Sequence, residues 1–169
     1  LGKAKKTVMF VGIKPEIRTI VEAAANKIAM PYAVNRWVGG MLTNFSQMKK
    51  RLEKKDGIAT MKTTGEIEKY TKKERLIIDD EAGELEVLFG GMQGMTRVPD
   101  ALVVVDARHE AIALREAGMM GISTIALLNT DGDVKGVTYP IVANDAARES
   151  VTLFVNDLAS AYEEGTRAQ

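Results

Sequence analysis

The chain has 169 residues, 46% of them apolar and 27% charged, which excludes a wholly disordered chain and a fibrous repeat. No apolar run approaches the roughly 18 residues of a membrane span and no signal-peptide pattern opens the chain, so a membrane partner is not expected. Cysteine is absent, which excludes disulfides, thiolate zinc sites and thiol nucleophiles. His109 is the single histidine, so a multi-histidine metal site is excluded as well.

The formal net charge of zero hides an uneven distribution. Residues 1–55 contain 12 Lys and Arg against 3 Asp and Glu, whereas residues 56–169 contain 11 against 20. Two interpretations are open. The halves fold together and their charges interleave, or the molecule presents one cationic and one anionic surface, the first of which suits a polyanion.

The first elements alternate between strand and helix. The apolar run Thr7–Gly12 predicts a buried parallel strand. Pro15 can occupy the first turn of a helix, and apolar residues then recur at helical spacing to about Ala29. Pro31 ends this helix, and residues 32–34 predict a second short strand.

The next segment, residues 43–94, is too long for a simple crossover between strands. Apolar residues recur in it at spacings of three and four, first at Phe45, Met48 and Leu52 and then at Ile78, Ala82, Leu85 and Phe89. A polar stretch around Lys62–Thr71 separates the two runs, and Gly90, Gly91 and Gly94 mark the return to the sheet. This pattern predicts an inserted antiparallel coiled-coil helical hairpin.

The two predicted arms of the hairpin carry opposite charges. The first is basic, with Lys49, Lys50, Arg51, Lys54 and Lys55, and the second is acidic, with Asp79, Asp80, Glu81, Glu84 and Glu86. We therefore expect ion pairs between the arms that help to fix their register, each contributing only ~0.2–1 kcal/mol where it is exposed.

The remaining elements again alternate: a strand at Ala101–Asp106, a helix at Ala111–Gly118, a strand at Ser123–Leu128 and a strand at Val137–Val142. Pro140 assigns the last of these strands to an edge of the sheet. Asp145 is the expected N-cap of a final helix over residues 146–162, followed by a frayed tail at 163–169.

This alternation predicts an α/β fold, a Rossmann-like doubly wound parallel sheet with an inserted helical hairpin. The predicted division is a sheet domain comprising residues 1–42 and 95–162, an inserted hairpin over residues 43–94, and a tail.

Candidate residues for chemistry lie where strands of the predicted sheet end. Gly12 and Lys14 follow the first strand, but the stretch VGIKPE lacks a complete phosphate-binding motif. Asp106, Asp131 and Asp133 follow later strands and could hold Mg²⁺, or they could simply cap helices and turns. A stand-alone nucleotide- or magnesium-binding domain using Gly12, Asp106 and Asp131 is therefore the alternative hypothesis. His109 has no partner base, so no catalytic site, cofactor or metal is expected.

The segment RWVGGMLTNF, Arg36–Phe45, is the third candidate. Trp37 is either a wedge between the sheet and the hairpin or, with Arg36, a contact for RNA. Thr43 or Asn44 is expected to cap the first hairpin helix.

Together with its neighbours, this segment resembles the signature of the bacterial-type ribosomal protein S2 family. The resemblance rests on MPYAVNRWVGGMLTNF at 30–45, FVGIK at 10–14, TKKE at 71–74, GGMQGM at 90–95, VPDALVVVD at 98–106 and NDAA at 144–147. Members of this family carry additional residues before the first strand, including a basic arm, so the chain is expected to be truncated or naturally reduced at that end.

The resemblance implies a non-enzymatic protein of the small ribosomal subunit, in the cytoplasmic ribosome or an organellar one. It implies docking on ribosomal RNA near the head–body junction, contact with neighbouring small-subunit proteins, and help in anchoring small-subunit protein one during translation. The residues assigned to the RNA-facing surface are Arg36, Trp37, Thr43, Asn44, Lys49, Lys50, Arg51, Lys54 and Lys55, with Lys72, Lys73, Arg97 and Arg108 as further neighbours.

Overall fold

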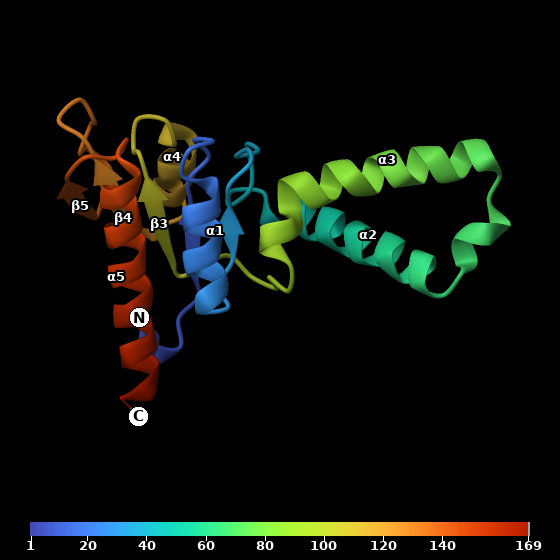
Figure 1. The fold of residues 1–169 in the computed structure, drawn as a ribbon, viewed down its shortest axis with the longest axis horizontal. Coiled ribbons are helices and arrows are strands. Elements are labelled where there is room, and N and C mark those ends of the chain that lie inside the picture. Colours follow the sequence, from blue (N-terminus) through green and yellow to red (C-terminus); the bar gives the residue numbers. More distant parts are fainter. Residues whose placement is uncertain (169) are drawn as a thin grey trace.

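The computed structural model describes residues 1–168 as a sheet with flanking helices and a long projecting hairpin (Figure 1). All five strands are parallel and lie in the order β2-β1-β3-β4-β5. Their bounds are β1 Val8–Val11, β2 Tyr32–Ala33, β3 Ala101–Val105, β4 Ser123–Leu128 and β5 Tyr139–Val142. Because the order reverses between β1 and β3, the predicted doubly wound α/β fold is confirmed, and β5 occupies an edge as Pro140 indicated.

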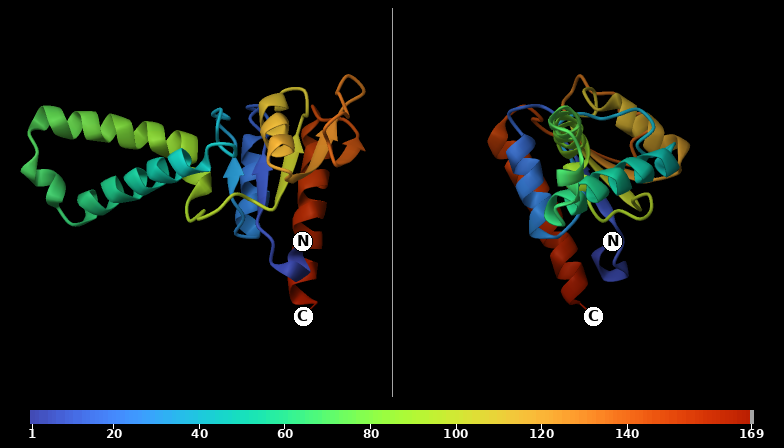
Figure 2. Two further views of the ribbon diagram at one scale, coloured as in Figure 1. Left: turned by 180° about the vertical axis from the view of Figure 1, so that it is seen from behind. Right: turned by 90° about the vertical axis from the view of Figure 1, so that its right-hand side faces the viewer.

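Residues 1–168 include five α-helices, of which the first four lie between strands and the last follows β5: α1 Arg18–Lys27, α2 Phe45–Thr63, α3 Lys72–Phe89, α4 Ala111–Met119 and α5 Arg148–Arg167. Three short 3-10 helices complete the described elements: η1 Gly2–Ala4, η2 Glu66–Lys69 and η3 Gly90–Met92. Helices α1 and α5 cover one face of the sheet, and α4 covers the other (Figures 1 and 2). No helix within residues 1–168 combines the length and the apolar character needed to cross a membrane.

The side chains of the central strands alternate between two apolar clusters. Val8 and Phe10 pack with α1 and α5 on one face, whereas Met9 and Val11 face α4 and the base of the hairpin. This period of two is the geometry of a β-strand, and the burial of both faces accounts for the unbroken apolar runs in the sequence.

On the α4 face, the loop between β2 and α2 covers part of the sheet, as a helix does on the other face. Trp37, Met41 and Leu42 are buried there, in the same cluster as Met48 of α2 and Phe89 of α3. The apolar core therefore continues from the sheet into the base of the hairpin.

The hairpin itself was predicted, and α2 and α3 form it. A continuous coiled-coil seam is not confirmed, because the two helices are close near the sheet and diverge toward the loop that joins them (Figure 1). Leu52 and Leu85 are buried near the base, but Leu76 and Ile77, near the other end, are 62% and 57% exposed. The buried Ile58 of α2 and the partly buried Ile78 of α3 still pack in the apolar cluster, whereas the exposed Leu76 and Ile77 lie outside the predicted seam.

At the return from the hairpin, η3 lies against β2. A Cβ atom at Gly91 would overlap the backbone oxygen and the ring of Tyr32, so this close approach requires glycine. The sequence analysis identified this glycine cluster as the break in helix packing, and the approach to Tyr32 gives the physical reason.

Several predicted boundaries were wrong. Helix α1 begins at Arg18, after a turn that includes Pro15, and β5 begins at Tyr139. Asp145 does not cap α5, because its carboxylate accepts the backbone N–H of Asn129 at 3.1 Å. Asn144 instead accepts the N–H groups of Ala146 and Ala147, both at 3.0 Å.

The prediction of a frayed tail was wrong for residues 163–167, which continue α5; Gln169 lies outside the described residues. The short helix η1 packs against this last part of α5, where Gly2 is buried. The Tyr162 hydroxyl donates a hydrogen bond to the Lys6 carbonyl at 2.9 Å, which attaches the end of the helix to the segment leading into β1.

Candidate nucleic-acid interface

The loop between β2 and α2 is built around one carboxylate, that of Glu116 on α4. Its Oε1 accepts hydrogen bonds from Trp37 Nε1 at 3.2 Å and from the Gly40 N–H at 2.7 Å. Its Oε2 accepts from the N–H of Leu42 at 3.0 Å and from both the N–H and the hydroxyl of Thr43 at 3.2 Å. Five donors therefore converge on one side chain and fix the conformation of the loop.

Glu116 is buried, yet it favours the ionised form. Burial raises its pKa, but the hydrogen bonds from Leu42, Gly40, Thr43 and Trp37 lower it by more, so the pKa lies below the usual value. Gly40 has a φ of +92°, a conformation that glycine adopts readily and in which its N–H meets the carboxylate.

The structure favours one of the two interpretations of Trp37, the wedge, and corrects the predicted cap of α2. Trp37 is only 7% exposed and bonded to Glu116, so its ring is a packed wedge rather than a stacking platform for a base. Neither Thr43 nor Asn44 provides a side-chain cap for α2; Thr43 binds Glu116, and Asn44 accepts from the Ser46 hydroxyl at 3.3 Å. Arg36, by contrast, is exposed, and no partner for it lies within residues 1–168.

The basic residues of α2 divide into two groups. Lys50 and Arg51 are exposed and have no hydrogen bond or ion pair with any other described residue. Lys55 is 8% exposed and points into the hairpin, where its Nζ lies 3.0 Å from Glu86 Oε2. Lys55 is therefore less available for an RNA contact than Lys50 and Arg51, because its charge is already paired inside the hairpin.

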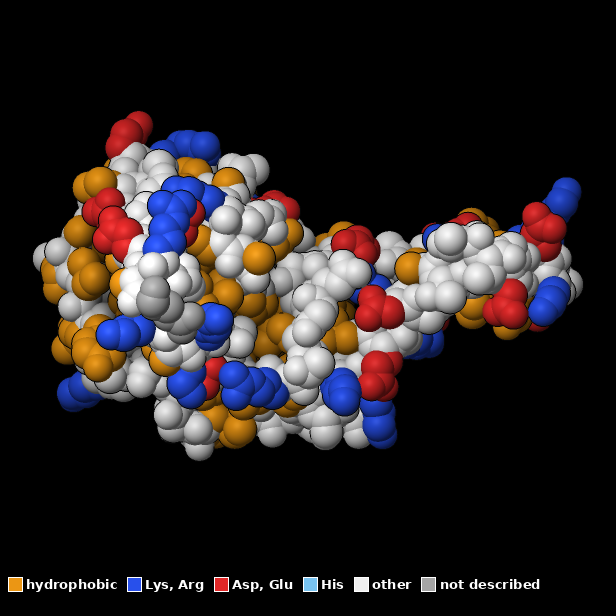
Figure 3. Space-filling model, turned by 90° about the horizontal axis from the view of Figure 1, so that it is seen from below, with side chains coloured by type: hydrophobic (Ala, Val, Ile, Leu, Met, Phe, Trp, Pro, Cys, Tyr) orange, Lys and Arg blue, Asp and Glu red, His pale blue; other side chains and the backbone are white. Residues whose placement is uncertain are grey.

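The predicted ion pairs between the hairpin arms are confirmed. Besides Lys55 with Glu86, Lys54 pairs with Glu81, and Lys62 Nζ lies 2.7 Å from Asp79 Oδ1. Basic and acidic side chains alternate along the projecting arm (Figure 3). Lys49 has only a distant pair with Glu53 on its own helix, at 3.9 Å, so Lys49, Lys50 and Arg51 leave α2 with uncompensated positive charge.

The other predicted residues are not brought together with this group. Lys72 and Lys73 are exposed in the first turn of α3, at the far end of the hairpin from Arg36. Arg97 lies before β3 and pairs with Asp100 at 3.3 Å. Arg108 follows β3 at the opposite edge of the sheet and pairs with Asp131 at 2.8 Å.

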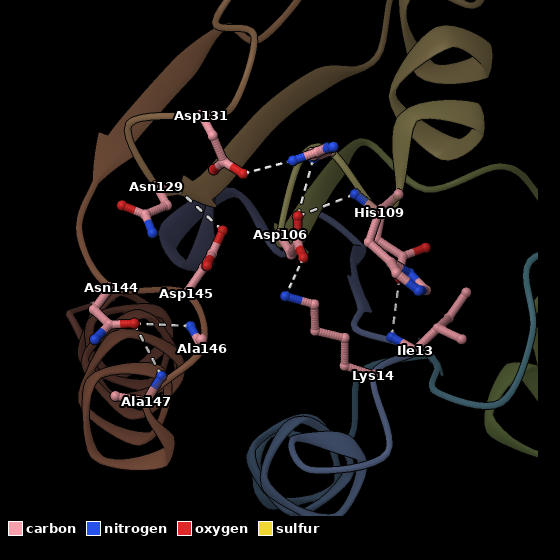
Figure 4. A network of polar contacts seen from close by, with 12 residues as sticks. Ile13, Lys14, Asp106, His109, Asn129, Asp131, Asn144, Asp145, Ala146 and Ala147 are labelled. Atoms are coloured by element: carbon pink, nitrogen blue, oxygen red, sulfur yellow. Dashed lines mark hydrogen bonds and ion pairs between the residues drawn. The ribbon is translucent and has the colours of Figure 1, made fainter.

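The carboxyl edge of the sheet, where the strand order reverses, is filled by the protein's own side chains (Figure 4). The Lys14 ammonium pairs with Asp106, whose carboxylate also accepts the N–H groups of Arg108 at 3.1 Å and His109 at 3.0 Å. Burial raises the pKa of Asp106, and these partners lower it further than burial raises it.

Glu110, only 2% exposed, binds the loop that follows β1. Its Oε1 accepts the Ile13 N–H at 3.1 Å and contacts His109 Nδ1 at 3.1 Å (Figure 4). Burial raises the pKa of Glu110. The first backbone donor after Gly12 is thus already bonded within the chain.

This arrangement argues against the alternative hypothesis of nucleotide or magnesium binding. Asp106 and Asp131 each pair with a cation, and Asp133 accepts the Lys135 N–H at 2.8 Å. Within residues 1–168, no three acidic or histidine side chains come together as metal ligands would. The three aspartates therefore pair with cations and fix turns, as the simpler interpretation expected.

The sequence analysis missed Glu116 and Glu110, the two carboxylates that organise these regions. The sequence did contain a signal for Glu116. It lies three residues after Ala113 and directly before Ala117, so helical spacing places it on the apolar side of α4. A charged residue at a buried helical position requires several hydrogen-bond donors, and these had to come from a distant segment.

Comparison with known proteins agrees with this architecture. Residues 1–165 match the family described as ribosomal protein S2. The chain is 45% identical over 160 residues to the small ribosomal subunit protein uS2 of Sulfurimonas denitrificans, covering 95% of this chain and 62% of that protein. It is 44% identical over 160 residues to the uS2 protein of Wolinella succinogenes, covering 95% and 59% respectively.

The uS2 protein of Mycolicibacterium paratuberculosis is 44% identical over 163 residues, covering 96% of this chain and 59% of that protein. The chain thus spans about 60% of the length of these curated relatives. From the extent of the family match and from these identities, we conclude that the chain belongs to the ribosomal protein S2 family.

Proposed function

We propose that this chain is a structural, non-enzymatic component of the small ribosomal subunit that binds ribosomal RNA through the base and first arm of its hairpin. The observation that carries the proposal is the unpaired positive charge of Lys50 and Arg51 on α2, beside a loop that Glu116 holds rigid. Family membership supports the ribosomal setting. Docking near the head–body junction, which the sequence resemblance implied, is part of the proposal.

The charges of α2 suit phosphate contacts rather than base recognition. Lysine and arginine on one exposed helix bind the RNA backbone by displacing counterions, so binding is strongly salt-dependent and largely independent of sequence. Pairing of Lys54 with Glu81 and of Lys55 with Glu86 keeps the acidic arm attached, while Lys49, Lys50 and Arg51 remain available to the RNA.

Arg36 extends this surface to the base of the hairpin. It is adjacent in sequence to Trp37, whose ring is buried and bonded to Glu116, so its backbone is held in a fixed position before any RNA binds. A contact from a preorganised loop costs less conformational entropy than one from a mobile segment. We therefore include Arg36 with Lys49, Lys50 and Arg51 in the principal RNA-binding group.

A double charge reversal, Lys50→Glu with Arg51→Glu, tests the proposal. The probe is the small-subunit ribosomal RNA of Sulfurimonas denitrificans, transcribed in vitro, with binding measured by filter retention at several salt concentrations. We expect the affinity to fall by about tenfold or more and the salt slope to drop by about two units. The matched control Arg115→Glu with Lys135→Glu makes the same change of net charge on exposed residues elsewhere.

Equal losses in both double variants would contradict a localised surface, as would unchanged binding by the hairpin variant. Circular dichroism and thermal unfolding of both variants establish whether the fold persists. No RNA binding by the unmodified chain would remove the proposed function altogether.

The second arm suits protein partners. On the exposed side of α3, the acidic residues Asp80 and Glu84 alternate with the exposed apolar residues Ile77 and Val87. The negative charge of this surface would repel RNA phosphates. We therefore propose that α3 faces neighbouring small-subunit proteins, and that this side of the molecule helps to anchor protein one. Asp80→Lys with Glu84→Lys should reduce the amount of such proteins in reconstituted subunits without weakening RNA binding; normal protein content would contradict this.

A further inference from the structure

We propose that the amino edge of the sheet is a second RNA-phosphate contact surface, separate from the hairpin. This amino-edge surface consists of Lys3, Lys5, Lys6, Lys27, Arg97 and Arg167. The inference rests on the proposed RNA-binding function and adds to it a site on the sheet itself. Several Lys and Arg side chains lie on the side of the sheet domain that is seen from below in Figure 3.

Four segments distant in sequence meet at this edge. The Val8 N–H lies 3.4 Å from the sulfur of Met30, which holds the chain after α1 beside the start of β1. Tyr162 of α5 binds the Lys6 carbonyl at 2.9 Å, and the Thr7 N–H donates to Asp100, immediately before β3, at 2.9 Å. These contacts bring the segments that carry the amino-edge cations to one edge of the sheet, and Lys6 and Arg97 both pair with Asp100 there.

A shallow notch of about 170 Å³ gives independent support for this proximity. Leu1 and Gly2 line it together with Ile28 and Leu158. Lys3 follows Gly2 and Lys27 precedes Ile28 in the sequence, so the backbone of each lysine is adjacent to a residue that lines the notch. The C-terminal turn of α5, with Arg167, closes the same side of the sheet (Figure 2).

The carboxylates at this edge leave part of its positive charge without an ion-pair partner. Asp100 pairs with both Lys6, at 3.0 Å, and Arg97, at 3.3 Å, so one carboxylate serves two cations. Glu163 pairs with Arg167 at 2.5 Å, and Lys5 and Lys27 have no ion pair within residues 1–168.

Helix stability explains only part of this pattern. Lys27 and Arg167 stand in the last turns of α1 and α5, where a cation is favourable by roughly 0.3–1 kcal/mol next to the partial negative charge of a helix end. Lys5, Lys6 and Arg97 are outside any α-helix, so this effect does not account for them.

The amino-edge surface also connects to the hairpin. Arg97 lies in the segment that leads from η3, at the hairpin base, to β3. One folded RNA surface could therefore contact the basic arm and the sheet edge together, and two tethered contacts strengthen each other through effective concentration. An acidic protein would also fit such a surface, but the proposed function supplies RNA as the polyanion that is present.

The test is the triple neutralisation Lys5→Gln, Lys27→Gln and Arg97→Gln, which leaves Asp100 paired with Lys6. Binding to the same in vitro transcript is measured against salt concentration, at constant magnesium. We expect the salt slope to fall by about two to three units and the affinity by about tenfold or more. The control Arg115→Gln, Lys135→Gln and Arg148→Gln removes the same charge from exposed positions outside both proposed surfaces.

If the amino-edge variant bound RNA with the same affinity and salt slope as the control, this inference would be overturned. The proposed function would then stand if Lys50→Glu with Arg51→Glu still weakens binding, and an unmodified chain that fails to bind RNA would overturn both. If the variant does not fold, lysine acetylation of the unmodified chain tests the same surface. Acetylation read by mass spectrometry should show Lys5 and Lys27 protected by RNA while Lys135 is not; equal reactivity of all three with and without RNA would contradict the surface.

Discussion

The indole Nε1 of Trp37 donates a hydrogen bond to the Glu116 carboxylate at 3.2 Å, across 79 positions of the sequence. This contact gives a structural reason for the tryptophan–diglycine segment. The loop wraps around a buried anion on α4, and its glycine supplies a backbone donor in a conformation that other residues adopt rarely. The base of the hairpin is thereby attached to the sheet domain.

Replacing Glu116 with glutamine should destabilise the protein by about 2 kcal/mol. An amide retains one acceptor oxygen but directs an NH₂ group toward donors that previously met Oε2, such as the Leu42 N–H. Urea unfolding followed by tryptophan fluorescence measures the change. Glu84→Gln, an exposed position on α3, should stay within about 0.5 kcal/mol of the unmodified protein. A Glu116→Gln variant as stable as this control would refute the anchoring role.

The stabilising effect of Glu116 should disappear in acid. Because its pKa in the folded protein lies below the usual value of 4.5, the contribution is complete above about pH 4.5 and is lost as the pH falls through the lowered pKa. The difference in unfolding free energy between the unmodified protein and Glu116→Gln should therefore narrow below that pH. Urea titrations at several pH values between neutrality and acid measure it, and a constant difference would contradict the ionised state of Glu116.

Lys55 and Lys50 should respond differently to the same substitution. Lys55→Met replaces a buried lysine paired with Glu86 by an apolar side chain of similar length, so the unfolding free energy should change by less than about 1.5 kcal/mol and RNA binding should be unaffected. Lys50→Met removes an exposed, unpaired cation and should lower the salt slope by about one unit without loss of stability. Equal effects of both variants on RNA binding would mean that Lys55 also reaches RNA.

Free nucleotide with magnesium should not stabilise the protein against heat. The Ile13 N–H is bonded to Glu110, and Asp106 is paired with Lys14, so the backbone donor and the carboxylate on which the alternative hypothesis depends already have partners within the chain. A ligand present at about one hundred times its Kd would add about 2.7 kcal/mol of stability, equivalent to several degrees in Tm. Thermal unfolding with and without MgATP measures this, and a clear rise in Tm would reinstate the alternative hypothesis.

Much of the fold was predictable because its signals are local. Unbroken apolar runs marked the buried strands, Pro140 marked the edge strand, and the spacing of Met48 and Leu52 marked the first hairpin helix. Asp145 illustrates the limit. It has the right residue type and position for an N-cap, but in the fold its carboxylate meets the Asn129 N–H, and the adjacent Asn144 binds the backbone before α5 instead.

The candidate interface was predictable only in part for the same reason. Composition identified a basic first arm and an acidic second arm, but spacing alone did not separate Lys50, which faces solvent, from Lys55, which faces Glu86. That distinction depends on where the two helices lie relative to each other. The sequence analysis did not group the cations of the amino-edge surface, because they come from four separate segments. Only the first segment, with Lys3, Lys5 and Lys6, has a high density of basic residues.

The sequence by itself determined the order of strands and helices, the opposite charges of the two arms and the family, because each depends on residues close together along the chain. Only the tertiary structure decided which charges remain available. Glu116 and Glu110 bind backbone donors that are 76 and 97 positions away, at Gly40 and Ile13, and such pairings exist only once packing has brought those segments together.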